Sequence, residues 1–250
     1  MTQWILCPIR NGLHYTKEAL KTFFAQDIGE VSVLFINNDS QDGTARWLNT
    51  VGVCSIYMNP PLSVAQSWNY GLRWLFGPMR VNYVLVVNND VKLRPDTYRH
   101  LVEDGGPFVT GVGVKEEEKI QPEQIYTDLH CYPKPDPAAK RPHPDFSCFL
   151  IRRECYEKVG PFDENFKIAF AEDCDYHVRL HKAGIGAYCL DLPFLHYGSQ
   201  TIALADNEER RLISEQAEKN REYFYQKWGV RIGTPEYEEL FQIAPSPTER

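Results

Sequence analysis

The sequence predicts a single-domain α/β protein whose mostly parallel central sheet is flanked by helices, with a long helix near the C-terminus. Short apolar runs alternate with amphipathic segments through the first half of the 250 residues, a pattern typical of βαβ units. The apolar run at 82–87 ends abruptly in polar residues, as a parallel strand does when both of its faces are buried. We find no internal repeat and no linker, so one domain is favoured.

The alternation of apolar and amphipathic segments ends at 115–145. Five prolines between His130 and Pro144 exclude a regular helix or a central strand there. This loop and the segment 196–205 are candidate lids over a binding site. Strands are expected at 3–9, 31–37, 52–57, 82–87 and 108–114, and helices at 15–26, 42–50, 62–76 and 95–102.

Order resumes at Phe146 after this loop. The helix at 172–182 has acidic residues in its first turn and Gly184 after its end, both of which are typical helix boundaries. The second half is expected to contain helices at 152–159, 172–182 and 205–228, a strand at 185–190, and a flexible tail at 244–250.

The formal net charge of −7 disfavours broad binding to nucleic acid or anionic lipid. Seven cysteines without a C-x-x-C pair indicate neither a disulfide framework nor a zinc ribbon. Cys7, Cys54 and Cys189 lie in apolar runs and are expected to be small core residues. Cysteines that are not arranged in pairs imply a reducing compartment. The sequence also has no signal-peptide pattern and no transmembrane run, so it predicts a cytoplasmic protein.

Polar residues follow the strand at 82–87: Asn88, Asn89 and Asp90. The carboxyl edge of an α/β sheet is where ligands bind. Mg²⁺ and Mn²⁺ prefer oxygen ligands, and a bound diphosphate often supplies those that the protein does not. Asp90 is therefore a candidate ligand of a metal–diphosphate site, and His196 is a possible second ligand, although a lone histidine in a loop is more often structural.

Two further segments carry polar residues toward the same edge. Asn37 and Asp39 follow the second strand and could hold a nucleobase or ribose, although a plain capped turn explains much of this segment. Asn69 and Gly71 stand inside a helix, where both are poor helix formers. We expect Asn69 to make a polar contact at the cleft and Gly71 to permit close approach of another backbone.

The cluster Glu172-Asp173-Cys174-Asp175 opens a predicted helix. The helix dipole alone favours carboxylates at this position. A carboxylate within reach of a sugar hydroxyl could also act as a general base. His177 and His181 follow one helical turn apart, and without a third ligand we expect them on an ordinary exposed face rather than in a zinc site.

Together these motifs resemble the family 2 glycosyltransferases of the GT-A fold over about residues 4–228, and among them the rhamnosyltransferase-like polysaccharide transferases. The resemblance rests on order and spacing more than on any one motif. It is carried by Cys7-Pro8-Ile9-Arg10-Asn11, Asn37 through Thr44, Asn69-x-Gly71, Asn88-Asn89-Asp90 in place of D-x-D, Val159 through Glu164, Glu172-Asp173-Cys174-Asp175 and His196.

The resemblance implies an inverting, metal-dependent transfer from a nucleotide-diphosphate sugar to a glycan or another hydroxyl acceptor. One domain would span 1–243, with a nucleotide-sugar half at 1–114 and an acceptor and catalytic half at 115–243. Asp173 would be the base, Glu172 and Asp175 would orient the acceptor, and Asp90 with His196 would hold Mn²⁺ or Mg²⁺. The expected donor contacts are Pro8, Arg10, Asn11, Asn37, Asp39, Asn69, Asn88, Asn89 and Asp90.

Asn37 and Asn88 replace acids of the family pattern, so the nucleotide (UDP, dTDP or GDP) and the acceptor stay open. These replacements also leave room for a degenerate protein that binds a nucleotide sugar or carbohydrate without turnover. A sugar nucleotidyltransferase is a further alternative. It is disfavoured because residues 8–15 lack the glycine-rich, basic loop that such an enzyme uses for a triphosphate.

Overall fold

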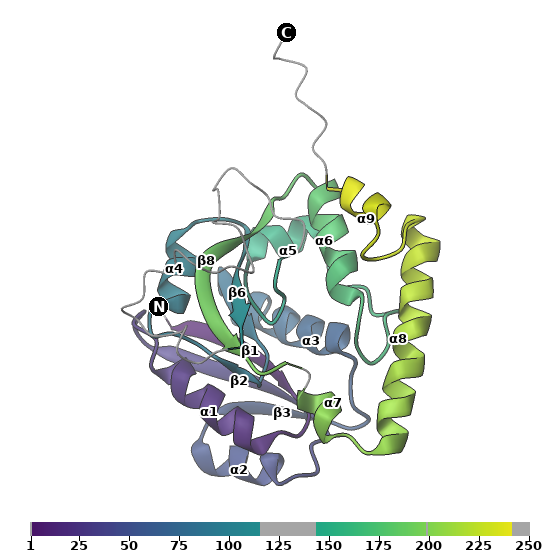
Figure 1. The fold of residues 1–250 in the computed structure, drawn as a ribbon. Helices are drawn as coiled ribbons and strands as arrows, with labels where there is room; N and C mark the ends of the chain where they lie inside the picture. The colour runs from purple at the N-terminus through teal and green to yellow at the C-terminus, as the bar shows by residue number, and fades with distance from the viewer. Residues whose placement is uncertain (1, 116–143, 199, 242–250) are drawn as a thin grey trace.

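The computed structural model describes residues 2–115, 144–198 and 200–241. Within these residues an eight-stranded sheet has the order β3-β2-β1-β4-β7-β6-β8-β5 (Figure 1). The loop expected at 115–145 and the tail expected at 244–250 lie almost wholly outside the described residues. The strands are β1 (Gln3–Ile9), β2 (Val31–Asn38), β3 (Cys54–Met58), β4 (Tyr83–Val87), β5 (Val91–Lys92), β6 (Phe108–Val114), β7 (Cys148–Arg152) and β8 (Ala187–His196).

The α/β class and the mostly parallel sheet are confirmed. Strand β7 runs antiparallel to both neighbours, and β5 runs antiparallel to β8. The described helices are α1 (Leu13–Phe24), α2 (Thr44–Val51), α3 (Val64–Phe76), α4 (Thr97–Glu103), α5 (Arg153–Val159), α6 (Glu172–Lys182), α7 (Gln200–Leu204), α8 (Asn207–Trp228) and α9 (Pro235–Glu239).

The sheet lies between two helical layers. Alternate residues of β4 enter different cores, because successive side chains of a strand point to opposite faces. Leu85 and Val87 join α1, α2 and α4 on one face, whereas Val84 and Val86 join α3, α5 and α6 on the other. All four side chains are fully buried, which is why the run contains no polar residue.

Several expected elements differ from the observed ones. The helix expected at 205–228 is α8, whereas strands β5 and β7 and helices α7 and α9 were not expected. The strand expected at 185–190 continues to His196 and passes through Pro193. Its partner β6 shifts register between Thr110 and Val112, opposite this proline. Such an irregularity accommodates a residue that lacks a backbone N–H donor.

Three small residues illustrate how position decides packing. Cys7 and Cys189 are buried as expected, but Cys54 is exposed because β3 is the edge strand of the sheet. Gly71 does permit a close approach, although its neighbour is a side chain and not the expected backbone. A Cβ placed on Gly71 would lie 2.2 Å from Cδ1 of Leu6.

Helices α8 and α9 add a smaller core against α6, and Figure 1 shows α8 as a long rod along one side of the molecule. Phe224 of α8 and Tyr237 of α9 pack with Val178 of α6. The exposed face expected for His177 is wrong, since its ring stacks on Phe241 with centroids 4.0 Å apart. None of the helices described could cross a membrane, because none combines the necessary length and apolarity.

Candidate active site

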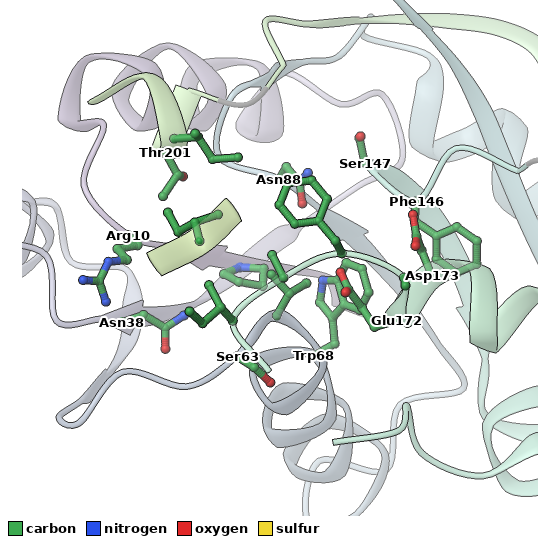
Figure 2. Close-up of a pocket in the computed structure, with 18 of the residues that line it drawn as sticks. Arg10, Asn38, Ser63, Trp68, Asn88, Phe146, Ser147, Glu172, Asp173 and Thr201 are labelled. Atoms are coloured by element: carbon green, nitrogen blue, oxygen red, sulfur yellow. The ribbon is translucent and has the colours of Figure 1, made fainter. Parts of the chain in front are cut away.

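A cavity of about 1020 Å³ opens at the carboxyl edge of the sheet. Strands β1, β4 and β8 end at this edge, and β7, being antiparallel, begins there. Figure 2 shows the labelled lining residues from separate parts of the chain, with Asn88, Glu172 and Asp173 facing the same space. The predicted site residues that line the cavity are Pro8, Arg10, Asn88, Asn89, Asp90, Glu172, Asp173 and His196.

Asp90 and His196 lie together on one wall. The distance from Oδ1 of Asp90 to Nε2 of His196 is 3.5 Å. The other ring nitrogen, Nδ1, lies 3.0 Å from Oγ of Ser147. The expected loop position of His196 is corrected: it is the last residue of β8 and pairs with Val91 of β5.

These residues fit a divalent metal. A hydrogen bond at one imidazole nitrogen orients the ring so that the other nitrogen can bind the ion. Among the residues that the structure describes, no group of three or more His, Cys, Asp or Glu side chains is placed to hold a metal. Asp90 and His196 are the ligands that the described residues would supply, and substrate oxygens or water would complete a shell of the kind that Mg²⁺ or Mn²⁺ adopts.

Glu172 and Asp173 lie in the wall contributed by the first turn of α6 (Figure 2). Burial, and then the neighbouring Asp173 carboxylate, raises the pKa of Glu172 to about 8. Burial, and to a smaller extent the negative charge of Asp145, also raises the pKa of Asp173. Hydrogen bonds from Cys174 oppose this and lower the pKa.

The two carboxyl groups differ in their hydrogen bonds. Asp173 Oδ1 accepts the backbone N–H of Cys174 at 2.8 Å, which favours its ionised form. Glu172 Oε2 is buried and has no hydrogen-bond partner among the described residues, which favours a protonated carboxyl. The pKa of both carboxyl groups is raised, and of the two Glu172, which lacks the stabilising N–H, holds a proton more tightly than Asp173.

Asp175, expected to orient an acceptor, does not line the cavity. Its carboxylate is fully buried, and its neighbours engage both oxygens. Arg179 donates to Oδ2 at 3.0 Å, and the indole N–H of Trp228 donates to Oδ1 at 2.9 Å. Lys227 Nζ lies 2.7 Å from Oδ1. Asp175 therefore joins α6 to α8, and we do not carry it into the proposed acceptor site.

Asn69 was expected at the cleft and also lies outside the cavity lining. Its amide N–H groups donate to the carbonyl of Phe162 at 2.8 Å and to Glu164 at 2.9 Å. Its Oδ1 accepts the N–H of Phe162 at 2.8 Å. Asn69 is therefore a buried clamp on the segment that leads toward α6, and this explains a polar residue inside a helix.

Asn37, Asp39 and Asn11 occupy the same sheet edge but not the cavity wall. Asn37 Oδ1 accepts the N–H of Ser40 at 3.1 Å. Asn11 Oδ1 accepts the N–H of Gln41 at 2.7 Å. Asp39 has a positive φ of 54° and its carboxylate accepts the hydroxyl of Tyr57. The structure thus places these three in the turn that supports the site.

Asn38 and Ser147 are among the polar lining residues that the sequence did not predict as site residues. Asn38 lines the cavity and binds Ser67 Oγ at 2.9 Å and the N–H of Leu62 at 3.2 Å. Alternation along β2 sends Asn38 and Asn37 to opposite faces, and this signal was available in the sequence. Ser147 precedes β7, which was itself missed, so no signal identified it.

Comparisons with known proteins agree with this architecture. The family model described as "Glycosyl transferase family 2" matches residues 4–160. A search of curated proteins found no significant match.

Three of the solved structures with similar folds come from two proteins and have low sequence identity to this chain. The mannosyltransferase PcManGT from Pyrobaculum calidifontis, in complex with GDP-Man and Mn²⁺, is 18% identical with a TM-score of 0.55, over 80% of this chain and 58% of that one. S. aureus TarS is 15% identical with a TM-score of 0.58, over 96% of this chain and 47% of that one. A TarS 1–349 structure in complex with UDP is 16% identical with a TM-score of 0.57, over 92% and 72%. The chain therefore spans about half the length of the first two proteins.

Proposed function

Because this chain belongs to glycosyl transferase family 2, we propose that it moves a sugar from a nucleotide-diphosphate sugar to an acceptor hydroxyl with inversion at the anomeric carbon. One observation carries the proposal. The cavity that contains Asp90 and His196 also contains Glu172 and Asp173, which supports a donor phosphate site and a proton acceptor that would share one space. The bound GDP-Man, UDP and Mn²⁺ of the structural neighbours support the choice of ligands.

The donor would occupy the β1 and β4 side of the cavity. Asp90 and His196 would hold Mn²⁺ or Mg²⁺ there, and such an ion supplies positive charge that stabilises a departing diphosphate. Arg10 and Asn88 line the same region and offer donors to phosphate and ribose oxygens. Base contacts by Asn37 and Asp39 stay a prediction, since both lie outside the lining.

Asp173 would act as the general base. With the proton held on Glu172, the ionised Asp173 accepts the proton of the acceptor hydroxyl while that oxygen attacks the anomeric carbon. The bond from this carbon to the phosphate oxygen breaks in the same displacement, and the nucleoside diphosphate leaves. A single displacement inverts the anomeric configuration, as in inverting glycoside hydrolysis with a sugar hydroxyl in place of water.

The test begins with binding, because the acceptor is not yet identified. Thermal unfolding is recorded with UDP-, dTDP- and GDP-sugars, with and without Mn²⁺, for the wild type, Asp90→Asn and Asp173→Asn. A ligand at about 100 times its Kd stabilises the fold by about 2.7 kcal/mol, or roughly 5–10 °C in a chain of this size. Asp90→Asn should lose the Mn²⁺-dependent part of this shift, whereas Asp173→Asn should keep it.

Turnover then separates an enzyme from a binding protein. The preferred donor is incubated with a panel of glycan acceptors, and nucleoside diphosphate release and product anomer are measured. We expect release by the wild type, an inverted product and no detectable transfer by Asp173→Asn. Full transfer by that variant would remove Asp173 as the base. Donor stabilisation without release would favour the binding protein, and pyrophosphate release from a nucleoside triphosphate would favour the nucleotidyltransferase.

A further inference from the structure

The loop 167–171, which precedes the acidic turn of α6, has an unusual backbone. Three of its residues have positive φ: Ile168 at 60°, Phe170 at 82° and Ala171 at 71°. None is glycine, and a β-branched isoleucine rarely adopts this conformation. All five residues of the loop line the cavity. Such conformations persist only where surrounding contacts enforce them, and they concentrate at functional sites.

The enforcing contacts come from Asn220, on the neighbouring helix α8. Its Nδ2 donates to the carbonyls of Lys167 at 2.8 Å, Ala169 at 2.8 Å and Phe170 at 3.1 Å. Its Oδ1 accepts the N–H of Lys167 at 3.2 Å. The two hydrogens on Nδ2 are thus shared among three carbonyl oxygens. Asn220 is only 1% exposed. Asn220 is not among the residues that line the cavity.

A second contact fixes the other side of the loop. The N–H of Val64, the first residue of α3, donates to the carbonyl of Ile168 at 2.8 Å. The loop ends at Ala171, the residue that caps α6 and whose carbonyl accepts the N–H of Asp175 at 3.0 Å. The path of the loop therefore sets where the first turn of α6 begins.

We propose that Asn220 is a positioning residue for transfer: its carboxamide holds the strained loop 167–171 so that Asp173 faces the acceptor hydroxyl. This inference rests on the proposed function, because it assigns to Asn220 an effect on the base of that reaction. The contacts of Asn220 all lie on the acceptor side. Its loss should therefore impair the chemical step and leave the donor–metal side at Asp90 and His196 intact.

The test compares Asn220→Ala with Ala217→Gly in the full chain. Ala217 is buried on the same helix one turn earlier, and glycine there weakens α8 while retaining every contact of Asn220. For each protein we would measure thermal stability, donor affinity, kcat, and hydrogen exchange of the amides at 166–175. Asn220→Ser, which keeps one hydroxyl donor, serves if the alanine variant does not fold.

We expect kcat to fall roughly 10- to 100-fold in Asn220→Ala, the scale of a base displaced by about an ångström. Donor affinity should stay within twofold, and exchange should rise at 166–175. Ala217→Gly should lower the melting temperature and leave kcat within twofold of the wild type. Asn220→Ser should lie between the wild type and Asn220→Ala.

Two results would overturn the inference. One is a kcat within twofold of the wild type in Asn220→Ala, or in Asn220→Ser where that variant replaces it. The other is an equal loss of kcat in Ala217→Gly, which would reduce Asn220 to a contributor to overall stability. A wild type that releases no nucleoside diphosphate would instead contradict the proposed function itself.

Discussion

Replacing Glu172 by Gln should make the protein more stable at alkaline pH. The pKa of Glu172 is raised by burial and by Asp173 from 4.5 to about 8. Between these two values the folded chain binds more protons than the unfolded chain, so the free energy of unfolding falls as pH rises. The difference corresponds to roughly 5 kcal/mol at about 1.36 kcal/mol per pH unit. Glutamine stays neutral and removes this loss.

The assay is urea unfolding of the wild type and Glu172→Gln at pH 5, 7 and 9. We expect the stability advantage of the variant to increase from pH 5 to about pH 8 and then to level off, with a total change of several kcal/mol between pH 5 and pH 9. Glu157→Gln, at an exposed position on α5, is the matched control and should show no such trend. Parallel pH profiles for the wild type and Glu172→Gln would refute the assignment of the proton to Glu172.

Three further changes test the framework around the site. Gly71→Ala should cost about 1–3 kcal/mol of stability in urea unfolding, because the new Cβ would meet the side chain of buried Leu6; an unchanged midpoint would contradict the packing. Asn69→Ala should cost about 2–4 kcal/mol, since three hydrogen bonds are lost, and a loss below 0.5 kcal/mol, roughly a single exposed contact, would argue against the clamp. Ser147→Ala should weaken Mn²⁺ binding about 10- to 100-fold in calorimetric titration, because Nδ1 of His196 loses its partner; an unaltered affinity would show that this hydrogen bond does not orient a metal-binding His196.

The sequence predicts a strand well where burial on both faces alone explains its apolar composition. The apolar run of β4 is buried on both faces, and the polar residues after it could only reach the carboxyl edge. Local sequence alone therefore predicts the position of Asp90 at this edge, where it lines the cavity. Strand β7 was missed although Cys148–Arg152 is equally buried, because it follows a proline-rich segment and its two neighbours, β4 and β6, are remote in sequence.

Side-chain roles that depend on distant partners were harder to predict. Asn69 was expected to make a polar contact at the cleft, and Asp175 was expected to orient the acceptor because it belongs to the acidic cluster that carries the family resemblance. Their partners at Phe162 and Trp228 lie far along the chain, and no local pattern reveals them. Cys54 was misplaced for the same reason, since an edge strand and a central strand of similar composition differ only in what pairs with them.

We propose that Asp90 and His196 hold a divalent ion in the same cavity as Asp173. Crystals grown with Mn²⁺ and the preferred nucleoside diphosphate would test it through anomalous diffraction near the manganese edge. We expect one strong peak within about 2.5 Å of an Asp90 carboxylate oxygen, with the diphosphate against it. A peak outside this cavity, or a diphosphate bound away from Asp90, would contradict the account.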